Sequence, residues 1–77
     1  MKARIFVTLK EGVLDPQGQA IQGGLVSLGF DGVESVRQGK VIDIELQNSQ
    51  NAQARLTEMC EKLLANTVIE DYRIELE

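Results

Sequence analysis

The stretch Lys2-Ala3-Arg4-Ile5-Phe6-Val7-Thr8-Leu9-Lys10 decides the fold, because its side chains alternate strictly between two kinds. One set comprises Ala3, Ile5, Val7 and Leu9, and the other comprises Lys2, Arg4, Phe6, Thr8 and Lys10. A period of two that includes β-branched residues is typical of a strand with one buried face. The stretch therefore predicts a strand in a half-covered sheet, with Phe6 on the uncovered side.

Three later segments are also interpreted as strands. Residues 41–46 place Ile42, Ile44 and Leu46 on one side and Asp43 and Glu45 on the other. Residues 72–77 alternate in the same way, with Tyr72, Ile74 and Leu76 on the apolar side. Residues 33–37 are assigned to a strand that turns into 41–46 through Gln38-Gly39-Lys40, since a glycine between two such runs is typical of a hairpin.

Two helices lie between these strands. Asp15-Pro16 predicts the first start, because Asp caps free amides and Pro suits the first helical position. Gly29 predicts its end. The apolar stripe of this helix is Ala20, Ile21, Gly24, Leu25 and Leu28. Gly23-Gly24 is unusual inside a helix and is interpreted as close packing of the helix on the sheet.

The second helix follows the polar run Asn48-Ser49-Gln50-Asn51, which offers several caps, and Asn66 is expected to end it. Its apolar stripe is Ala52, Leu56, Met59, Cys60, Leu63 and Leu64, and its outer face is Arg55, Glu58, Glu61 and Lys62. The predicted order is therefore β-α-β-β-α-β in one domain over residues 1–77. This order predicts an α+β fold of the ferredoxin-like plan, a four-stranded antiparallel sheet with both helices on one face.

Length and composition exclude several functions. A compact chain of 77 residues exposes roughly 4,600 Å², so a standard partner patch of about 800 Å² would cover a large share of it. The absence of His excludes His-based acid–base catalysis and His metal sites, and a single Cys excludes an intrachain disulfide and a Cys-cluster metal site. We therefore expect a chain that works with partners.

The charge balance argues against two kinds of partner. Twelve acidic against eight basic residues give a net charge of −4, which disfavours non-specific nucleic-acid and anionic-membrane binding. No apolar run approaches the roughly 20 residues of a membrane span, and the first residues do not resemble a signal peptide. A cytoplasmic location is expected.

The search for chemistry yields no catalytic, cofactor-binding or metal-binding residue. Cys60 lies in an apolar stripe with no base to activate it, so core packing is favoured over a nucleophile. The acids Glu70, Asp71, Glu75 and Glu77 are split between strand faces, which favours a solvated rim over a cation site. The loop 11–18 feeds a helix start and leaves a weak anion site open, although it lacks both nucleotide-binding glycine spacings.

Phe6 and Val41 are the candidate interface residues. Both fall on the sheet face that the predicted helices leave uncovered. A single exposed aromatic means little, but two apolar side chains on one open face indicate a contact surface.

Five blocks in order along the chain resemble the PurS family. They are residues 7–11, residues 13–18, Leu28-Gly29, residues 36–40 and the long block from Met59 to Arg73. The resemblance covers nearly the whole chain. It departs from the family at Gly23-Gly24, where bulkier residues are common, and in a short tail that some members carry beyond the position of Glu77.

The resemblance implies a non-catalytic subunit of the multi-chain phosphoribosylformylglycinamidine (FGAM) synthase of purine biosynthesis. In that family the PurQ glutaminase releases ammonia, and the PurL synthetase uses it with ATP and Mg²⁺ to convert the formylglycinamide ribonucleotide to FGAM. PurS is expected to bridge the two, to assist ammonia transfer, to bind no cofactor and to form a homodimer or a tetramer.

Two alternatives share the predicted element order. An ACT-like regulatory module would bind a small effector at the loop from Glu11 to Gly18. An acylphosphatase-like enzyme would need an Arg and an Asn around a glycine-rich phosphate cradle, and the first loop has no such motif.

Overall fold

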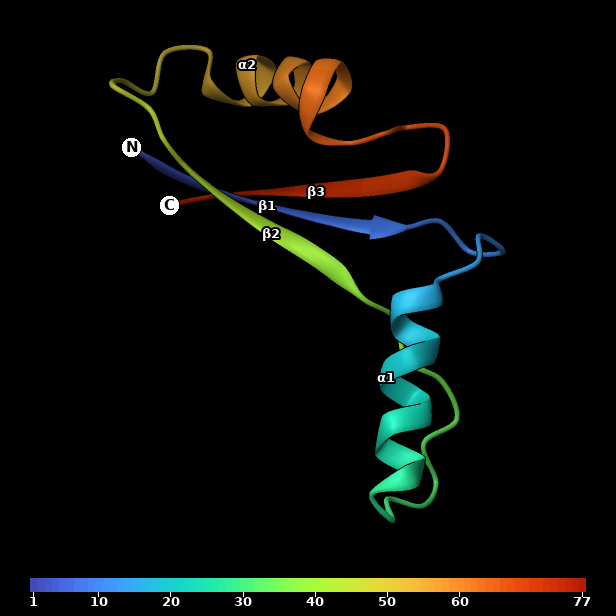
Figure 1. Cartoon of the computed structure of the whole chain (residues 1–77). Helices are drawn as coiled ribbons and strands as arrows, with labels where there is room; N and C mark the ends of the chain where they lie inside the picture. Colours follow the sequence, from blue (N-terminus) through green and yellow to red (C-terminus); the bar gives the residue numbers. More distant parts are fainter.

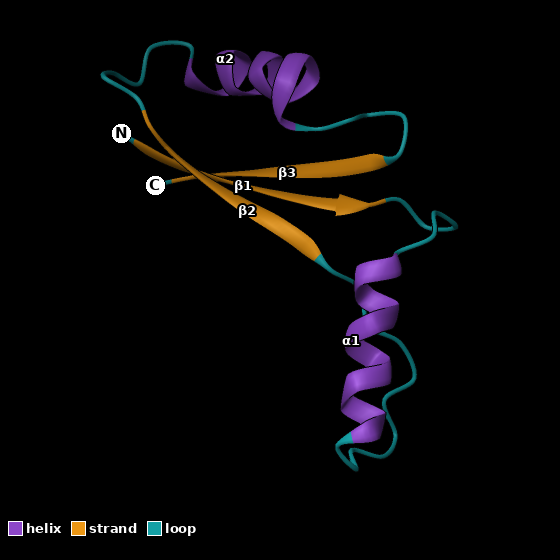
Figure 2. Ribbon diagram, viewed as in Figure 1, coloured by secondary structure: helices purple, strands orange, loops and turns teal.

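The computed structural model describes residues 1–77 and contains three strands and two helical segments (Figures 1 and 2). Their order is β1 (Lys2–Leu9), α1 (Pro16–Ser27), β2 (Gly39–Glu45), α2 (Ala52–Met59), the π-helical continuation η1 (Cys60–Leu64) and β3 (Glu70–Leu76). The three alternating segments with clear apolar faces thus form strands, and both expected helices form.

The sheet has the order β2-β1-β3, with β1 in the centre and antiparallel to both neighbours. Because β2 and β3 run the same way on opposite sides of β1, the connection through α2 is a crossover that spans the central strand. Both outer strands have an open edge. The register places Val41 and Arg73 opposite Phe6, one on each side.

Helix α2 and η1 cover one face of this sheet (Figure 1). The core consists of the inward side chains of β1 and of the helix: Ala3, Ile5, Val7, Leu56, Cys60 and Ala65. Half-buried apolar side chains of β2 and β3 surround it, among them Ile42, Ile44, Tyr72 and Ile74. We call the sheet with α2 and η1 the sheet module.

Helix α1 points away from the sheet module (Figure 1), and residues 30–38 run back beside it. We call residues 16–38 the arm. The arm makes the molecule long and narrow, with extents of 49 × 24 × 15 Å. The helix itself is well formed. Asp15 accepts a hydrogen bond from the amide of Gly18 (2.8 Å), and Gly29 (φ +94°) closes the C-terminus with Phe30 N donating to Leu25 O (3.0 Å).

The four-stranded prediction is wrong, because residues 33–37 form no strand. Instead this segment is hydrogen-bonded to helix α1 and to the loop before it. The Gln22 side-chain amide donates to the carbonyls of Val33 and Glu34 (both 3.1 Å), and the Arg37 guanidinium reaches back to the loop before α1. With that strand absent, β1 and β2 are direct antiparallel neighbours, and the chain between them forms the arm.

The placement of both helices on one face is also wrong, since only α2 covers the sheet. The expected packing of Gly23-Gly24 against the sheet fails for the same reason. A Cβ built on either glycine meets no atom within 4 Å beyond its chain neighbours and the nearby helix backbone. The reason for these two glycines is therefore not found within one copy of the chain.

Candidate interaction surfaces

Phe6 and Val41 lie side by side on the sheet face opposite α2, as their register requires. Phe6 is half-buried and the Arg73 guanidinium stacks over its ring at 4.2 Å, while Val41 is exposed. The rest of this face is charged. Arg4 pairs with Asp43 at 2.8 Å, Lys2 lies 3.9 Å from Glu45, and Arg73 also pairs with Glu75. The two apolar side chains thus lie within a field of ion pairs.

The Arg4–Asp43 pair is the best formed of these interactions. The guanidinium donates two hydrogen bonds, of 2.8 and 3.4 Å, to the two carboxylate oxygens. The hydrogen bond from Arg4 lowers the pKa of Asp43, and the same contact raises the pKa of Arg4. The two side chains remain 50% and 66% exposed, so the pair orders the open face but adds little to stability.

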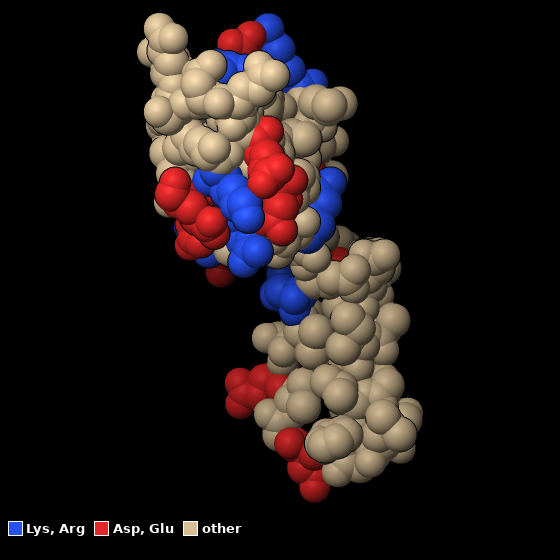
Figure 3. Space-filling model, turned by 90° about the vertical axis from the view of Figure 1, so that its left-hand side faces the viewer, with Lys and Arg blue, Asp and Glu red and all other residues tan.

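The arm carries a second, apolar surface. No charged residue occurs between Asp15 and Asp31, and large apolar side chains of this segment face solvent. The exposed members are Ile21, Val26, Leu28 and Phe30, with Leu28 77% exposed. In space-filling view the arm is tan apart from two groups of red acidic atoms on its lower part, whereas the sheet module carries dense red and blue patches (Figure 3).

The whole chain exposes 5682 Å², roughly 1,000 Å² more than a compact monomer of its mass. That excess is about the area that one partner loses in a standard protein–protein interface. The exposed side chains of the arm fit this interpretation of the excess area, since they are of the type found in interface cores and not on solvated helices.

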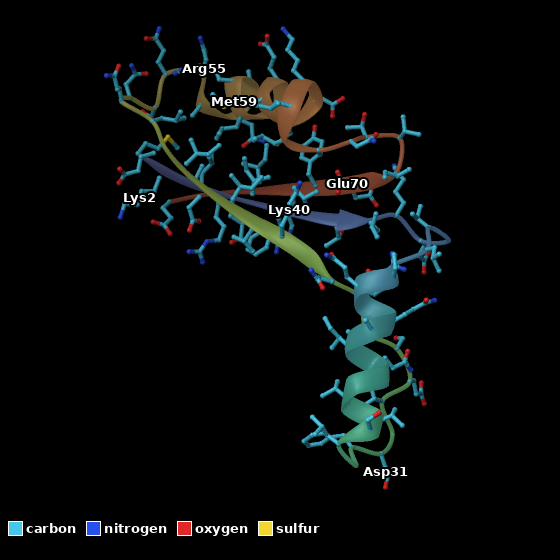
Figure 4. All side chains as sticks on the ribbon, viewed as in Figure 1. Lys2, Asp31, Lys40, Arg55, Met59 and Glu70 are labelled. Atoms are coloured by element: carbon cyan, nitrogen blue, oxygen red, sulfur yellow. The ribbon has the colours of Figure 1, made fainter.

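A third apolar area lies beside α2 on the sheet module. Ile44, Met59, Leu63 and Leu64 line a shallow groove whose rim is Arg55, Glu58 and Lys62. Figure 4 shows Arg55 and Met59 on this helix, at the opposite end of the molecule from Asp31 at the arm tip. Leu63 is 83% exposed near the end of η1, where Ala65 N donates to Cys60 O (3.0 Å).

The place where the arm meets the sheet module is polar. Asp15 is 5% exposed, and its carboxylate accepts hydrogen bonds from the amides of Gly18 and Gln38, both at 2.8 Å. These two bonds, the Gln38 bond first, hold the pKa of Asp15 below its usual value, and the Arg37 charge acts in the same direction. We call Asp15, Gly18, Arg37 and Gln38 the joint.

The hydrogen bonds of the joint disfavour the anion site that the loop 11–18 suggested. The amide of Gly18 in the first turn of α1 donates to the chain's own carboxylate at Asp15, which also places a negative charge where an anion would bind. The loop carbonyls of Leu9, Lys10 and Val13 accept from Arg37.

Cys60 and the acidic residues occupy places without catalytic chemistry. Cys60 is fully buried, and its burial, aided by the Glu61 charge, raises the pKa of its thiol. The Glu61 carboxylate, hydrogen-bonded to Tyr72, raises the pKa of that phenol to about 12. Asp71 pairs with Lys10 at 3.0 Å and Glu70 accepts from Asn66 N at 2.7 Å.

No three His, Cys, Asp or Glu side chains gather closely enough to hold a metal ion, and none of the helices has the length and apolar character required to cross a membrane.

The arm surface and the joint were not recognised from the sequence. The charge-free run from Pro16 to Phe30 is the signal that could have revealed the arm, because a helix on a sheet normally keeps charges on its solvated side. Asp15 was identified only as a helix cap, and its second bond to Gln38 joins residues 23 positions apart.

Comparison with known proteins gives a consistent result. Residues 2–77 match the family model PurS, described as phosphoribosylformylglycinamidine (FGAM) synthase. The phosphoribosylformylglycinamidine synthase subunit PurS of Bacillus subtilis is 51% identical over 77 residues, which is 99% of this chain and 92% of that protein.

Solved structures agree. A crystal form of B. subtilis PurS matches with a TM-score of 0.90 at 51% identity and covers 99% of this chain and 96% of its own. A chain in the structure of PurLQS from Thermotoga maritima matches with a TM-score of 0.79 at 32% identity, over 96% of this chain and 93% of that one. With its family model matched over nearly all residues and its fold shared at this identity, the chain belongs to the PurS family of FGAM synthase subunits.

Proposed function

We propose that this chain is the non-catalytic adaptor of a multi-chain FGAM synthase, in which it bridges a PurL synthetase and a PurQ glutaminase. The observation that carries the proposal is the close match to a chain of the PurLQS assembly of T. maritima. The proposed reaction consumes the formylglycinamide ribonucleotide, glutamine and ATP and yields FGAM. Ammonia released at PurQ is used at PurL, and the adaptor assists that transfer by holding the two together.

Chemistry in this scheme resides on the other subunits. The only thiol of this chain is buried with a raised pKa, and the chain has no His to act as a general base. ATP and Mg²⁺ are assigned to PurL, and no cofactor to this chain. The cytoplasm is the proposed location, because its reducing conditions suit the single unpaired Cys60.

The adaptor is further proposed to act as a homodimer, with pairing into tetramers as an extension. The excess exposed area and the uncharged run of residues 16–30 support a partner of this size. Phe6 and Val41 are proposed as contacts of a different kind. Their surroundings of ion pairs suit a polar partner surface, such as that of a larger subunit, better than an apolar core.

Reconstitution with PurL and PurQ tests the adaptor role. We expect glutamine-dependent FGAM formation to rise with the concentration of this chain and to saturate, while PurL supplied with high ammonium stays active without it. The matched control is PurL with ammonium across the same titration. Full glutamine-dependent activity with this chain omitted would contradict the proposal, and so would equal dependence of both nitrogen sources on it.

A further inference from the structure

The arm is attached to the sheet module through polar contacts and not through a shared apolar core. Helix α1 makes no extended contact with any strand or with α2, and its single buried residue is Gly18, at the joint. The core residues belong to β1, α2, η1 and the turn after η1. The direction of the arm is therefore set where residues 9–18 and residues 36–39 meet.

Asp15 is the centre of this meeting place. One carboxylate oxygen, Oδ1, accepts from Gly18 N in the first turn of α1, and the other, Oδ2, accepts from Gln38 N directly before β2. The Asp15 side chain thus connects the start of the arm to the residue directly before β2, where the chain leaves the arm. A plain helix cap needs only the first of these bonds.

Arg37 completes the joint from the other side. Its guanidinium donates to the carbonyls of Leu9 (3.0 Å), Lys10 (3.0 Å) and Val13 (3.3 Å), which form the loop between β1 and the arm. Three donors in a planar fork hold that loop in one shape, which the single ammonium of a lysine does not reproduce.

Two glycines permit the close approach that these bonds require. A Cβ on Gly18 would lie 2.7 Å from Asp15 Oδ2 and closer still to the Val36 carbonyl oxygen. A Cβ on Gly39 would lie 2.5 Å from the Val7 carbonyl oxygen. The backbone segments before β2 are therefore in direct contact with the start of α1 and with the end of β1.

We propose that Asp15 and Arg37 are positioning residues that set the direction of the arm relative to the sheet, and that the assembled synthase requires the arm in that direction. The second half of this statement rests on the proposed function. A change of angle at the joint is amplified along the arm. The apolar side chains from Ile21 to Phe30 lie far from the sheet, so a small rotation at Asp15 moves them by a large distance.

The competing explanation is that Asp15 only caps α1. Asp15→Ser separates the two, because a serine hydroxyl caps a helix well but cannot also accept from Gln38 N or carry a charge beside Arg37. Arg37→Lys is the second variant, since it keeps the charge but loses the fork. Asp31→Ser is the matched control, because it removes the same charge at the arm tip, where Asp31 is exposed (Figure 4).

The first measurement is the distance distribution between spin labels at Ser27→Cys and Glu45→Cys, with Cys60→Ala removing the native thiol. Labelled chain is diluted with unlabelled chain so that only distances within one copy contribute. We expect one narrow distribution in the parent and in Asp31→Ser. We expect a broad one in Asp15→Ser and Arg37→Lys, with helicity by circular dichroism unchanged. A narrow parental distribution in both joint variants overturns the joint and leaves Asp15 as a cap.

The second measurement is the concentration of each variant that half-saturates glutamine-dependent activity with PurL and PurQ. We expect it to rise by about tenfold in Asp15→Ser and Arg37→Lys and to stay unchanged in Asp31→Ser. Broad distances with unchanged half-saturation overturn the claim that the synthase requires the arm direction. If the parent chain itself proves dispensable for glutamine use, the adaptor role fails, whereas the spin-label result still decides the joint. If Asp15→Ser loses its helix, Arg37→Lys decides both questions.

Discussion

Helix α2 buries Ala52 and Leu56, with Leu56 in one core with the β1 side chains, whereas helix α1 buries only Gly18. The two also differ in charge. Four charged residues lie on α2 and η1, and none lies on α1. A charged outer face is needed when the inner face is covered by the same chain, because the outer face then meets water. A helix with good caps, exposed apolar side chains and no charge therefore indicates that its covering surface belongs to another molecule.

Truncation of one leucine in each region is expected to give the largest difference. Leu56→Ala removes a fully buried side chain of the sheet module and should lower the free energy of unfolding by about 2–5 kcal/mol. Leu28→Ala changes a side chain that is 77% exposed and should stay within about 0.5 kcal/mol in the separated chain.

Urea unfolding at a low and a high chain concentration checks both leucine variants. If the loss of unfolding free energy caused by Leu28→Ala grows with chain concentration, the arm is an interface between copies of the chain. An equal, large loss for both variants at every concentration would break the distinction between the regions.

Alanine at two arm glycines should give effects of opposite sign. Gly18→Ala forces a Cβ against the Val36 carbonyl and the Asp15 carboxylate, and should cost about 1–3 kcal/mol. The Cβ of Gly24→Ala meets no atom within 4 Å beyond its chain neighbours and the nearby helix backbone, so the change should stabilise the helix by about 1 kcal/mol.

Thermal unfolding of the Gly18→Ala and Gly24→Ala variants in parallel with the parent measures both signs. If Gly24→Ala instead weakens assembly while it stabilises the separated chain, a partner approaches α1 closely at that position. A loss for Gly24→Ala in the separated chain would show that the arm packs within its own copy.

The open sheet face should give the smallest effect. Asp43→Asn removes the partner of Arg4, but both side chains are largely exposed, so the denaturant midpoint at neutral pH should move only slightly. The pKa of Asp43 is lowered in the folded state. The contribution of Asp43 to the free energy of unfolding is therefore fully present at a pH above the pKa of an unfolded Asp. It is lost as the pH falls through the lower pKa of Asp43 in the folded chain.

Denaturant midpoints at neutral pH and at about pH 3 check this prediction. In the unfolded chain the Asp43 carboxylate is ionised at neutral pH and largely protonated at about pH 3. The gap between parent and Asp43→Asn should narrow on acidification. A gap that widens would mean that Asp43 is not stabilised by Arg4.

The sheet module could be predicted from sequence because its signals are local. Alternation in residues 2–10 and 41–46 and the stripe through Leu56 and Cys60 each report which face is covered, and the structure confirms all three. The strand prediction for residues 33–37 failed because this segment is hydrogen-bonded to helix α1, through the Val33 and Glu34 carbonyls, and to no neighbouring strand. Alternation over so short a run does not distinguish a strand from an extended segment bonded to a helix.

The direction of α1 could not be predicted, since a stripe of apolar residues does not reveal which molecule covers it. The joint depends on contacts between residues far apart in sequence, such as Gln38 N with Asp15, and no local pattern encodes them. Phe6 and Val41 were placed on the correct face by alternation, but the ion pairs around them follow from cross-strand register, which only the pairing of β1 with β2 and β3 establishes.

The charge-free run of residues 16–30 in the arm has a consequence for temperature and solvent. An association that removes Ile21, Val26 and Leu28 from water has a negative heat-capacity change and loses strength on cooling. Sulfate salts and osmolytes strengthen such a contact, whereas simple salt screens contacts made through the Arg4 and Asp43 face. A cold, low-salt buffer would therefore favour separation at the arm while it preserves attraction at the open sheet face, so the two kinds of contact should part under different conditions.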